Sequence, residues 1–129
     1  MIERTNAPKL SQPPGYSHVV VASGSRLVTT AGAVPLDAEG NLVGAGDLLV
    51  QARQTLENLA SALETVGAAG CDVIKTTVYV VAAERTDLGA VWGAVRESGL
   101  AGAASTLLGV SMLAIEGQLV EIEAIAVLE

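Results

Sequence analysis

The sequence contains no phenylalanine, and its aromatic side chains are limited to two tyrosines and one tryptophan. Half of its 129 residues are nevertheless hydrophobic. The core must therefore be built from aliphatic residues such as Ala, Val and Leu, and a chain of this length can bury such a core without disulfide bonds. We expect residues 1–129 to form a single domain.

Positive charge is also scarce. Seven Lys and Arg residues stand against 14 Asp and Glu residues, which gives a formal net charge of −7. The seven cations are scattered along the chain, whereas a nucleic-acid-binding protein needs a concentrated basic surface to neutralise phosphates. An acidic protein is likewise repelled by an anionic membrane surface. The sequence therefore predicts neither a nucleic-acid partner nor a membrane partner.

The chain has a single cysteine, Cys71, so no internal disulfide can form, and this fits a reducing compartment. The first 16 residues contain charged residues and three prolines instead of an apolar signal segment. No apolar run approaches the roughly 18 residues needed to cross a bilayer. We expect a cytoplasmic protein.

Aliphatic and β-branched residues that alternate with polar ones predict five strands. The first two, residues 17–23 and 26–32, are separated by a Gly-Ser pair, which predicts a hairpin with a tight turn. The proline-rich residues 1–16 are expected to be extended, and residues 35–46 to form a loop. The remaining three strands are expected at residues 73–81, 106–113 and 119–128.

Two segments show the three- and four-residue spacing of amphipathic helices. In the first, Asp47 is the expected N-cap and Gly67 the expected stop. The second is expected to begin at an N-cap on Thr86 or Asp87 and to end near residues 98–99. The apolar stripe of the first helix comprises Leu49, Ala52, Leu56, Leu59, Leu63 and Val66.

The resulting order, β-β-α-β-α-β-β, predicts an α+β fold in which two helices cover one face of a single mixed sheet. The other face would meet water, yet it is half apolar. On the last strand, Glu121 and Glu123 share this face with three aliphatic residues, Leu119, Ile125 and Val127. Such a face predicts burial against other subunits, with the two glutamates at the contact.

Five motifs, taken in order, resemble a known family. They are Tyr16 after a Pro-Gly pair, AGAVPLD at 31–37, QARQTLENL at 51–59, VIKTTVYV at 73–80 and VEIEAIA at 120–126. Together they resemble the Rid family, the reactive intermediate deaminases also called YjgF-type or RidA-like proteins, and the resemblance covers nearly the whole chain. The resemblance implies a chorismate-mutase-like fold and a barrel-like homotrimer with a cleft at each subunit interface. It also implies hydrolysis of enamines and imines to a keto acid and ammonia, with neither cofactor nor metal.

The resemblance further implies roles for individual residues. Glu121 matches the family glutamate that holds or activates water and is the expected catalytic residue. The expected substrate-binding residues are Tyr16, Gly32, Ala33, Ser105 and Thr106.

The family also has an arginine, just before the fifth strand, that binds the substrate carboxylate through a forked pair. Here that position falls on Ala104, or on Ser105 if the loop is shifted by one residue. A charge-assisted hydrogen bond is worth about 1.5–3 kcal/mol, so its loss predicts roughly ten- to hundredfold weaker binding of a carboxylate-bearing imine. In addition, Trp92 occupies a position that is polar in the family.

Three interpretations remain open. The first is an enamine or imine hydrolase of altered specificity or weak activity, acting on a substrate without a carboxylate. The second is a non-catalytic trimer that binds a small metabolite, and the third is a structural or chaperone-like trimer. Outside the expected site, Glu123 is predicted to pair structurally with Lys75, Trp92 to pack in the core, and His18 to lie on the surface.

Overall fold

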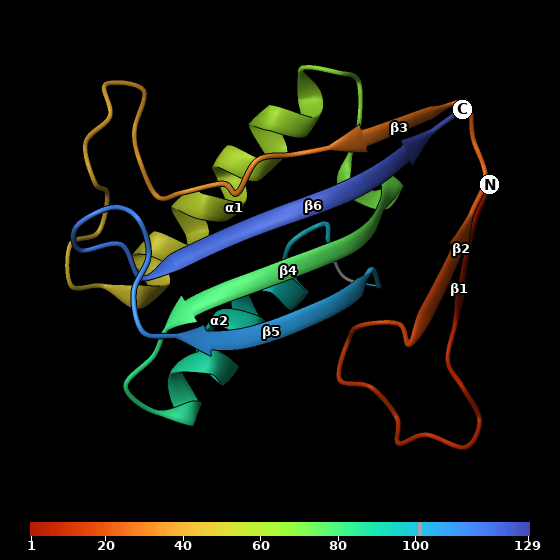
Figure 1. Ribbon diagram of the computed structural model, residues 1–129, viewed down its shortest axis with the longest axis horizontal. Coiled ribbons are helices and arrows are strands. Elements are labelled where there is room, and N and C mark those ends of the chain that lie inside the picture. Colours follow the sequence, from red (N-terminus) through yellow and green to blue (C-terminus); the bar gives the residue numbers. More distant parts are fainter. Residues whose placement is uncertain (101) are drawn as a thin grey trace.

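The computed structural model describes residues 1–100 and 102–129. Two helices lie behind a four-stranded sheet, and a two-stranded ribbon stands beside it (Figure 1). The elements are β1 (Ile2–Thr5), β2 (Val19–Ala22), β3 (Arg26–Thr29), α1 (Leu48–Glu64), the 3-10 turn η1 (Gly70–Asp72), β4 (Val73–Val81), α2 (Arg85–Glu97), β5 (Ala104–Val110) and β6 (Val120–Leu128).

The four-stranded sheet has the order β3-β6-β4-β5. Strands β4 and β5 are parallel, so the chain must cross over between them, and α2 makes this crossover on one face of the sheet. Strand β6 is antiparallel to both of its neighbours, β3 and β4. The predicted α+β class, with both helices on one face of a mixed sheet, is confirmed.

The predicted hairpin between residues 17–23 and 26–32 is wrong. Strand β2 pairs with β1, a segment that we expected only to be extended, and the two form a separate antiparallel ribbon. Strand β3 pairs instead with β6. The turn between β2 and β3 packs against the end of β6, where a Cβ on Gly24 would lie 2.4 Å from the Leu128 carbonyl oxygen. The chain therefore passes from the ribbon to the sheet at this point rather than reversing on itself.

The start of α1 is as predicted: the Asp47 carboxylate accepts a hydrogen bond from the Val50 amide at 3.1 Å. The helix ends at Glu64, and Gly67 follows with a φ of 78°, a conformation that favours glycine. Helix α2 begins earlier than predicted, with Glu84 as its N-cap. Asp87 lies inside the first turn, where its carboxylate still accepts hydrogen bonds from two backbone amides of the preceding turn.

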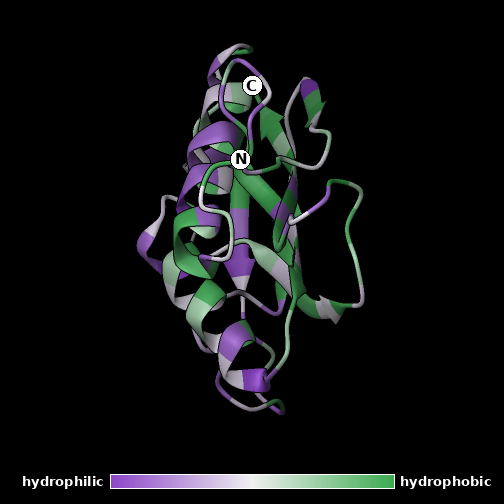
Figure 2. Cartoon of the chain, turned by 90° about the vertical axis from the view of Figure 1, so that its left-hand side faces the viewer, coloured by the Kyte–Doolittle hydropathy of each residue, from purple (hydrophilic) through white to green (hydrophobic). Residues whose placement is uncertain are grey.

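The core lies between the helices and the sheet, and its hydrophobic residues are aliphatic, as the composition predicted. Its largest fully buried hydrophobic residues are Leu59, Leu63, Val73, Val78, Val80, Val91, Val95, Val120 and Ile122. The view along the sheet in Figure 2 separates the helical layer from the sheet layer. Neither helix in the described part of the chain is long and apolar enough to cross a membrane.

The face of the sheet away from the helices is open. On β6, Val120 and Ile122 are fully buried on the helix side, whereas Ile125 on the open side is 36% exposed. The same alternation on β4 leaves Lys75 and Tyr79 half-buried on the open face. Glu121, which the family resemblance marks as the expected catalytic residue, lies on this face, opposite Tyr79.

Candidate functional site

The Glu121 carboxylate is held between a buried amide and a glycine. Its Oε1 accepts a hydrogen bond from Nε2 of Gln118 at 3.1 Å. Its Oε2 packs against the backbone of Gly32, where a Cβ would lie only 2.2 Å away. Any larger residue at position 32 would therefore displace the carboxylate.

The loop that precedes β6 fixes this geometry. Gln118 is 3% exposed; its Nε2 also donates to the Val120 carbonyl at 3.0 Å, and its Oε1 accepts from the Ile115 amide at 3.2 Å. Behind the loop, the fully buried Gln51 of α1 donates to the Gly117 carbonyl at 3.0 Å. The same side chain accepts from the Leu119 amide at 2.7 Å. Helix α1 therefore holds the loop in place, and the loop orients Glu121.

Gly32 and Ala33 lie beside Glu121, so the structure brings three of the expected site residues together. The Ala33 amide donates to the Ile122 carbonyl at 2.7 Å, and the Ile122 amide donates back at 3.1 Å. From α1, Asn58 donates to the Val34 carbonyl at 2.7 Å and to the Leu36 carbonyl at 2.8 Å. A cavity of about 450 Å³ lies between α1 and residues 28–34.

Tyr16 lies elsewhere, in an aromatic pocket between α2 and β5. The pocket has a volume of about 250 Å³ and is lined by Pro14, Tyr16, Trp92, Ser105 and Leu107. The rings of Tyr16 and Trp92 meet edge to face, with their centroids 6.1 Å apart. Trp92 therefore does more than pack in the core: its half-buried ring forms one wall of the pocket, and its Nε1 donates to the Pro14 carbonyl at 2.7 Å.

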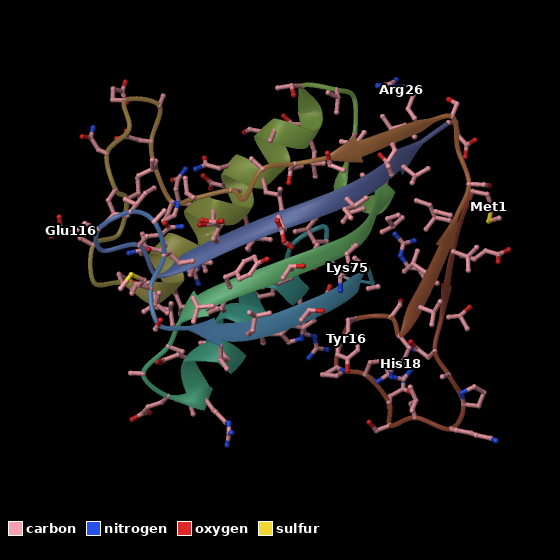
Figure 3. The ribbon with its side chains drawn as sticks, viewed as in Figure 1. Met1, Tyr16, His18, Arg26, Lys75 and Glu116 are labelled. Carbon is pink, nitrogen blue, oxygen red and sulfur yellow. The ribbon has the colours of Figure 1, made fainter. Side chains whose placement is uncertain are left out.

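Ser105 and Thr106 point to opposite faces of β5. The Ser105 hydroxyl lies 2.6 Å from the hydroxyl of Thr76, on the helix side of the sheet, and lines the aromatic pocket. Thr106 lies on the open face, where it accepts a hydrogen bond from Lys75 Nζ at 2.8 Å. Figure 3 shows Lys75 near the start of β5 and Tyr16 below it. The expected substrate-binding residues thus do not form one group: Gly32 and Ala33 lie beside Glu121, Tyr16 and Ser105 line the aromatic pocket, and Thr106 bonds to Lys75.

His18 is not the surface residue that was predicted, and Glu123 has a different partner from the predicted one. His18 is half-buried and edge-on to Tyr16 at 6.0 Å, and its Nδ1 accepts from the Ala7 amide at 3.0 Å. The predicted Glu123–Lys75 pair is wrong: in residues 1–100 and 102–129 the single ion pair joins the Met1 ammonium to Glu129.

Glu123 instead accepts a hydrogen bond from the hydroxyl of Tyr79 at 2.6 Å. This bond raises the pKa of Tyr79 above its usual value of 10.0, because the carboxylate stabilises the protonated phenol. Burial and the charges of Glu123 and Glu121 act in the same direction. Tyr79 thus stays neutral on the open face and ties Glu123 to β4.

Glu121 and the aromatic pocket are too far apart in one chain to act on one small molecule. In the strand register, Glu121 is opposite Tyr79, and Ser105 is opposite Thr76, three residues away and one strand further on. With a rise of about 3.3 Å per residue and about 4.8 Å between strands, Glu121 and Ser105 lie roughly 14 Å apart across the sheet. They also project from opposite faces.

The comparison with known proteins identifies the family. Residues 5–128 match the model of the family described as Endoribonuclease L-PSP. A crystal structure of YyfB from Yersinia pestis, a protein of unknown function in the conserved Rid family, shares 35% identity over 98% of both chains, with a TM-score of 0.93. The chain belongs to the Rid family.

Other Rid relatives have named functions or older names. The YjgF gene product of E. coli is 30% identical over 95% of this chain and 93% of its own, with a TM-score of 0.65. The 2-iminobutanoate/2-iminopropanoate deaminase of Salmonella typhimurium is 43% identical over 54 residues, which is 42% of this chain and 41% of the deaminase. A RutC family protein of Pyrococcus horikoshii is 40% identical over 75 residues, covering 58% of this chain and 56% of its own. The chain thus spans about half the length of the curated relatives that it matches.

The residues that position Glu121 were not predicted from the sequence. Gln51 and Asn58 lie outside the predicted apolar stripe of the first helix, and the sequence indicated no role for either of them or for Gln118. The available signal was the seven-residue spacing of Gln51 and Asn58, which places both on one helix face. In the described part of the chain, no group of three or more His, Cys, Asp and Glu side chains could hold a metal ion.

Proposed function

We propose that this Rid protein is a homotrimer that hydrolyses reactive enamines or imines and releases ammonia, with altered specificity because the family arginine is absent. The observation that carries the proposal is the orientation of Glu121. A carboxylate fixed by Gln118 on one side and bare backbone at Gly32 on the other has a defined position from which to hold a water molecule.

Hydrolysis of an imine requires only a positioned water molecule and a group that transfers protons. The carbon of an imine is already electrophilic, so a water held by Glu121 can add to it while the carboxylate takes up a proton. The imine nitrogen is protonated to an amine, and the tetrahedral carbon then expels ammonia as its oxygen becomes a carbonyl. Atoms and charge balance with water as the co-reactant, because Glu121 passes the proton from water on to the nitrogen, and the C=N double bond of the imine is replaced by the C=O double bond of the product as NH3 leaves.

In a trimer, the residues around Glu121 in one subunit can lie next to the aromatic pocket of another subunit, although the two are far apart within one chain. Glu121, Gly32 and Ala33 lie together, whereas Ser105 lies roughly 14 Å from Glu121 on the other face and shares the aromatic pocket with Tyr16. We propose that each site combines the first group from one subunit with the second group from its neighbour. The open face of the sheet, with Ile125 36% exposed, supplies the apolar surface that such contacts bury.

The test is imine decay measured directly, with the imine generated by an oxidase and the remaining imine trapped by semicarbazide. We expect the wild-type protein to accelerate decay, and Glu121→Gln to abolish the acceleration. Glu123→Gln is the matched control, because it changes the same chemical group two residues away on the same face. Equal activity of the wild-type protein and Glu121→Gln would remove Glu121 from the mechanism.

A second candidate is a non-catalytic trimer that binds a small metabolite, and the absence of a cation at Ala104 favours it. In that case a ligand raises the melting temperature, because it binds only the folded state, and no imine is consumed. RNA is not a proposed substrate, despite the family description, since a net charge of −7 opposes phosphate binding.

A further inference from the structure

The aromatic pocket between α2 and β5 has a chemical character of its own. None of its described lining residues carries a charge: they are Pro14, Tyr16, Trp92, Ser105 and Leu107. The nearby cation, Arg96, is exposed and packs its side chain along Gly15, and it is not among the residues that line the pocket. A ligand group in this pocket would meet two aromatic faces and aliphatic carbon.

Two of the three polar side-chain groups of the pocket walls, the Trp92 indole N–H and the Ser105 hydroxyl, already have partners within the protein. Trp92 Nε1 donates to the Pro14 carbonyl at 2.7 Å, which also fixes the orientation of the indole. The Ser105 hydroxyl lies 2.6 Å from the Thr76 hydroxyl and 3.2 Å from the Ala103 carbonyl oxygen. A carboxylate placed here would lose its hydration without gaining a charge-assisted bond from these two walls.

We infer that this pocket binds an uncharged aromatic or branched apolar group, and that the imines hydrolysed are neutral ones carrying such a group rather than imino acids. A volume of about 250 Å³ accommodates a phenyl or an indolyl group. The edge-to-face pair of Tyr16 and Trp92 leaves ring surface on which such a group can stack. The statement about turnover rests on the proposed hydrolase function, whereas the statement about binding does not.

Binding can be measured without any assumption about catalysis, because Trp92 is the chain's one tryptophan and its fluorescence reports on this pocket. The probes are 2-phenylethanol, which is neutral, and 3-phenylpropanoate, which has a ring of the same size and a carboxylate. We expect a saturable change in Trp92 fluorescence with the alcohol and at least about tenfold weaker binding of the carboxylate.

Two variants show whether the alcohol binds in the aromatic pocket or elsewhere on the protein. Tyr16→Ala keeps the tryptophan reporter and removes one aromatic wall, so we expect binding of 2-phenylethanol to weaken about five- to tenfold. Tyr79→Phe is the control, because this second tyrosine lies on the open face outside the pocket, and binding should be unchanged. Circular dichroism verifies that both variants are folded.

Turnover is tested with a matched pair of imines. Oxidation of 2-phenylethylamine gives a neutral imine, and oxidation of phenylalanine gives the same ring with a carboxylate added. Faster hydrolysis of the neutral imine, together with its loss in Tyr16→Ala, supports the inference. Saturable binding of the alcohol without hydrolysis of either imine supports the pocket's specificity and contradicts the hydrolase function. No saturable binding of the alcohol, equal binding of the carboxylate, or faster hydrolysis of the imino acid overturns the inference.

Discussion

Replacement of Gln118 by leucine should be unusually damaging for a change in a loop. Leucine has a similar volume and fills the same buried space, but it removes three hydrogen bonds: those to the Val120 carbonyl, to the Glu121 carboxylate and from the Ile115 amide. A lost neutral hydrogen bond costs about 0.5–1.5 kcal/mol, and a buried polar group left without a partner costs about 1–3 kcal/mol.

The expected loss of stability follows from these three hydrogen bonds. Gln118 is only 3% exposed, so water cannot readily replace the lost partners of Val120 and Ile115. We expect Gln118→Leu to lower the free energy of unfolding by about 3–5 kcal/mol, summed over the two backbone groups and the carboxylate. Where the protein remains folded, we also expect the rate of imine hydrolysis at saturation to fall while KM changes little, because Glu121 loses its orientation but the aromatic pocket is untouched.

The measurement is denaturant unfolding, followed by far-ultraviolet circular dichroism at a fixed protein concentration. Gln54→Leu is the control, since Gln54 makes one side-chain hydrogen bond, to Asn58, and should cost no more than about 1.5 kcal/mol. If Gln118→Leu is as stable as Gln54→Leu and equally active, the loop does not position Glu121 in the way we describe.

Three other predictions concern the open face and its surroundings. Because the pKa of Tyr79 is raised in the folded state, the stability from its bond to Glu123 is present below pH 10 and is lost as the pH rises through the folded pKa. When unfolding is measured as a function of pH, Tyr79→Phe should lack this loss of stability. Identical alkaline profiles of the variant and the wild-type protein would refute the bond between Tyr79 and Glu123. Gly32→Ala should displace the Glu121 carboxylate and reduce imine hydrolysis. Gly89→Ala is the control: this glycine has open space around it in α2, so the variant should be fully active and about 0.5–1 kcal/mol more stable. Equal activity of the two variants would contradict the close contact between Gly32 and Glu121. Light scattering should give about 39 kDa, three times the chain mass of 13.0 kDa, and a monomer would contradict the shared site.

Local sequence patterns predicted the positions of helices and strands better than they predicted which strands pair with each other. The strands at residues 73–81 and 119–128 and the Asp47 cap could be read from alternation and capping preference. Alternation says nothing about which strand is adjacent, however, so the pairing of β3 with β6 was missed. The tight packing of Gly24 against the end of β6, which accompanies that pairing, is a long-range contact that no local pattern contains.

In the candidate site, too, single residues could be predicted from the sequence, whereas their spatial partners could not. Glu121 and Gly32 were expected at the site because they match family positions, and the structure does place Gly32 beside Glu121. By contrast, placing Ser105 and Thr106 in one group overlooked the fact that successive residues of a strand point to opposite faces. Gln118 could not be identified in advance, because a buried amide is recognisable only when the backbone groups that it satisfies are known.

The central claim, that each catalytic site is shared by two subunits, is tested most directly by mixing one inactive variant, Glu121→Gln, with one impaired variant, Tyr16→Ala. Glu121→Gln and Tyr16→Ala each damage a different part of the site. In trimers assembled at random from equal amounts of both, one site in about four combines an intact Glu121 with an intact Tyr16 from the neighbouring subunit. After co-refolding we predict about a quarter of the wild-type rate of imine hydrolysis from these restored sites, above the mean rate of the two variants measured separately. A mixture no faster than that mean would contradict the shared site.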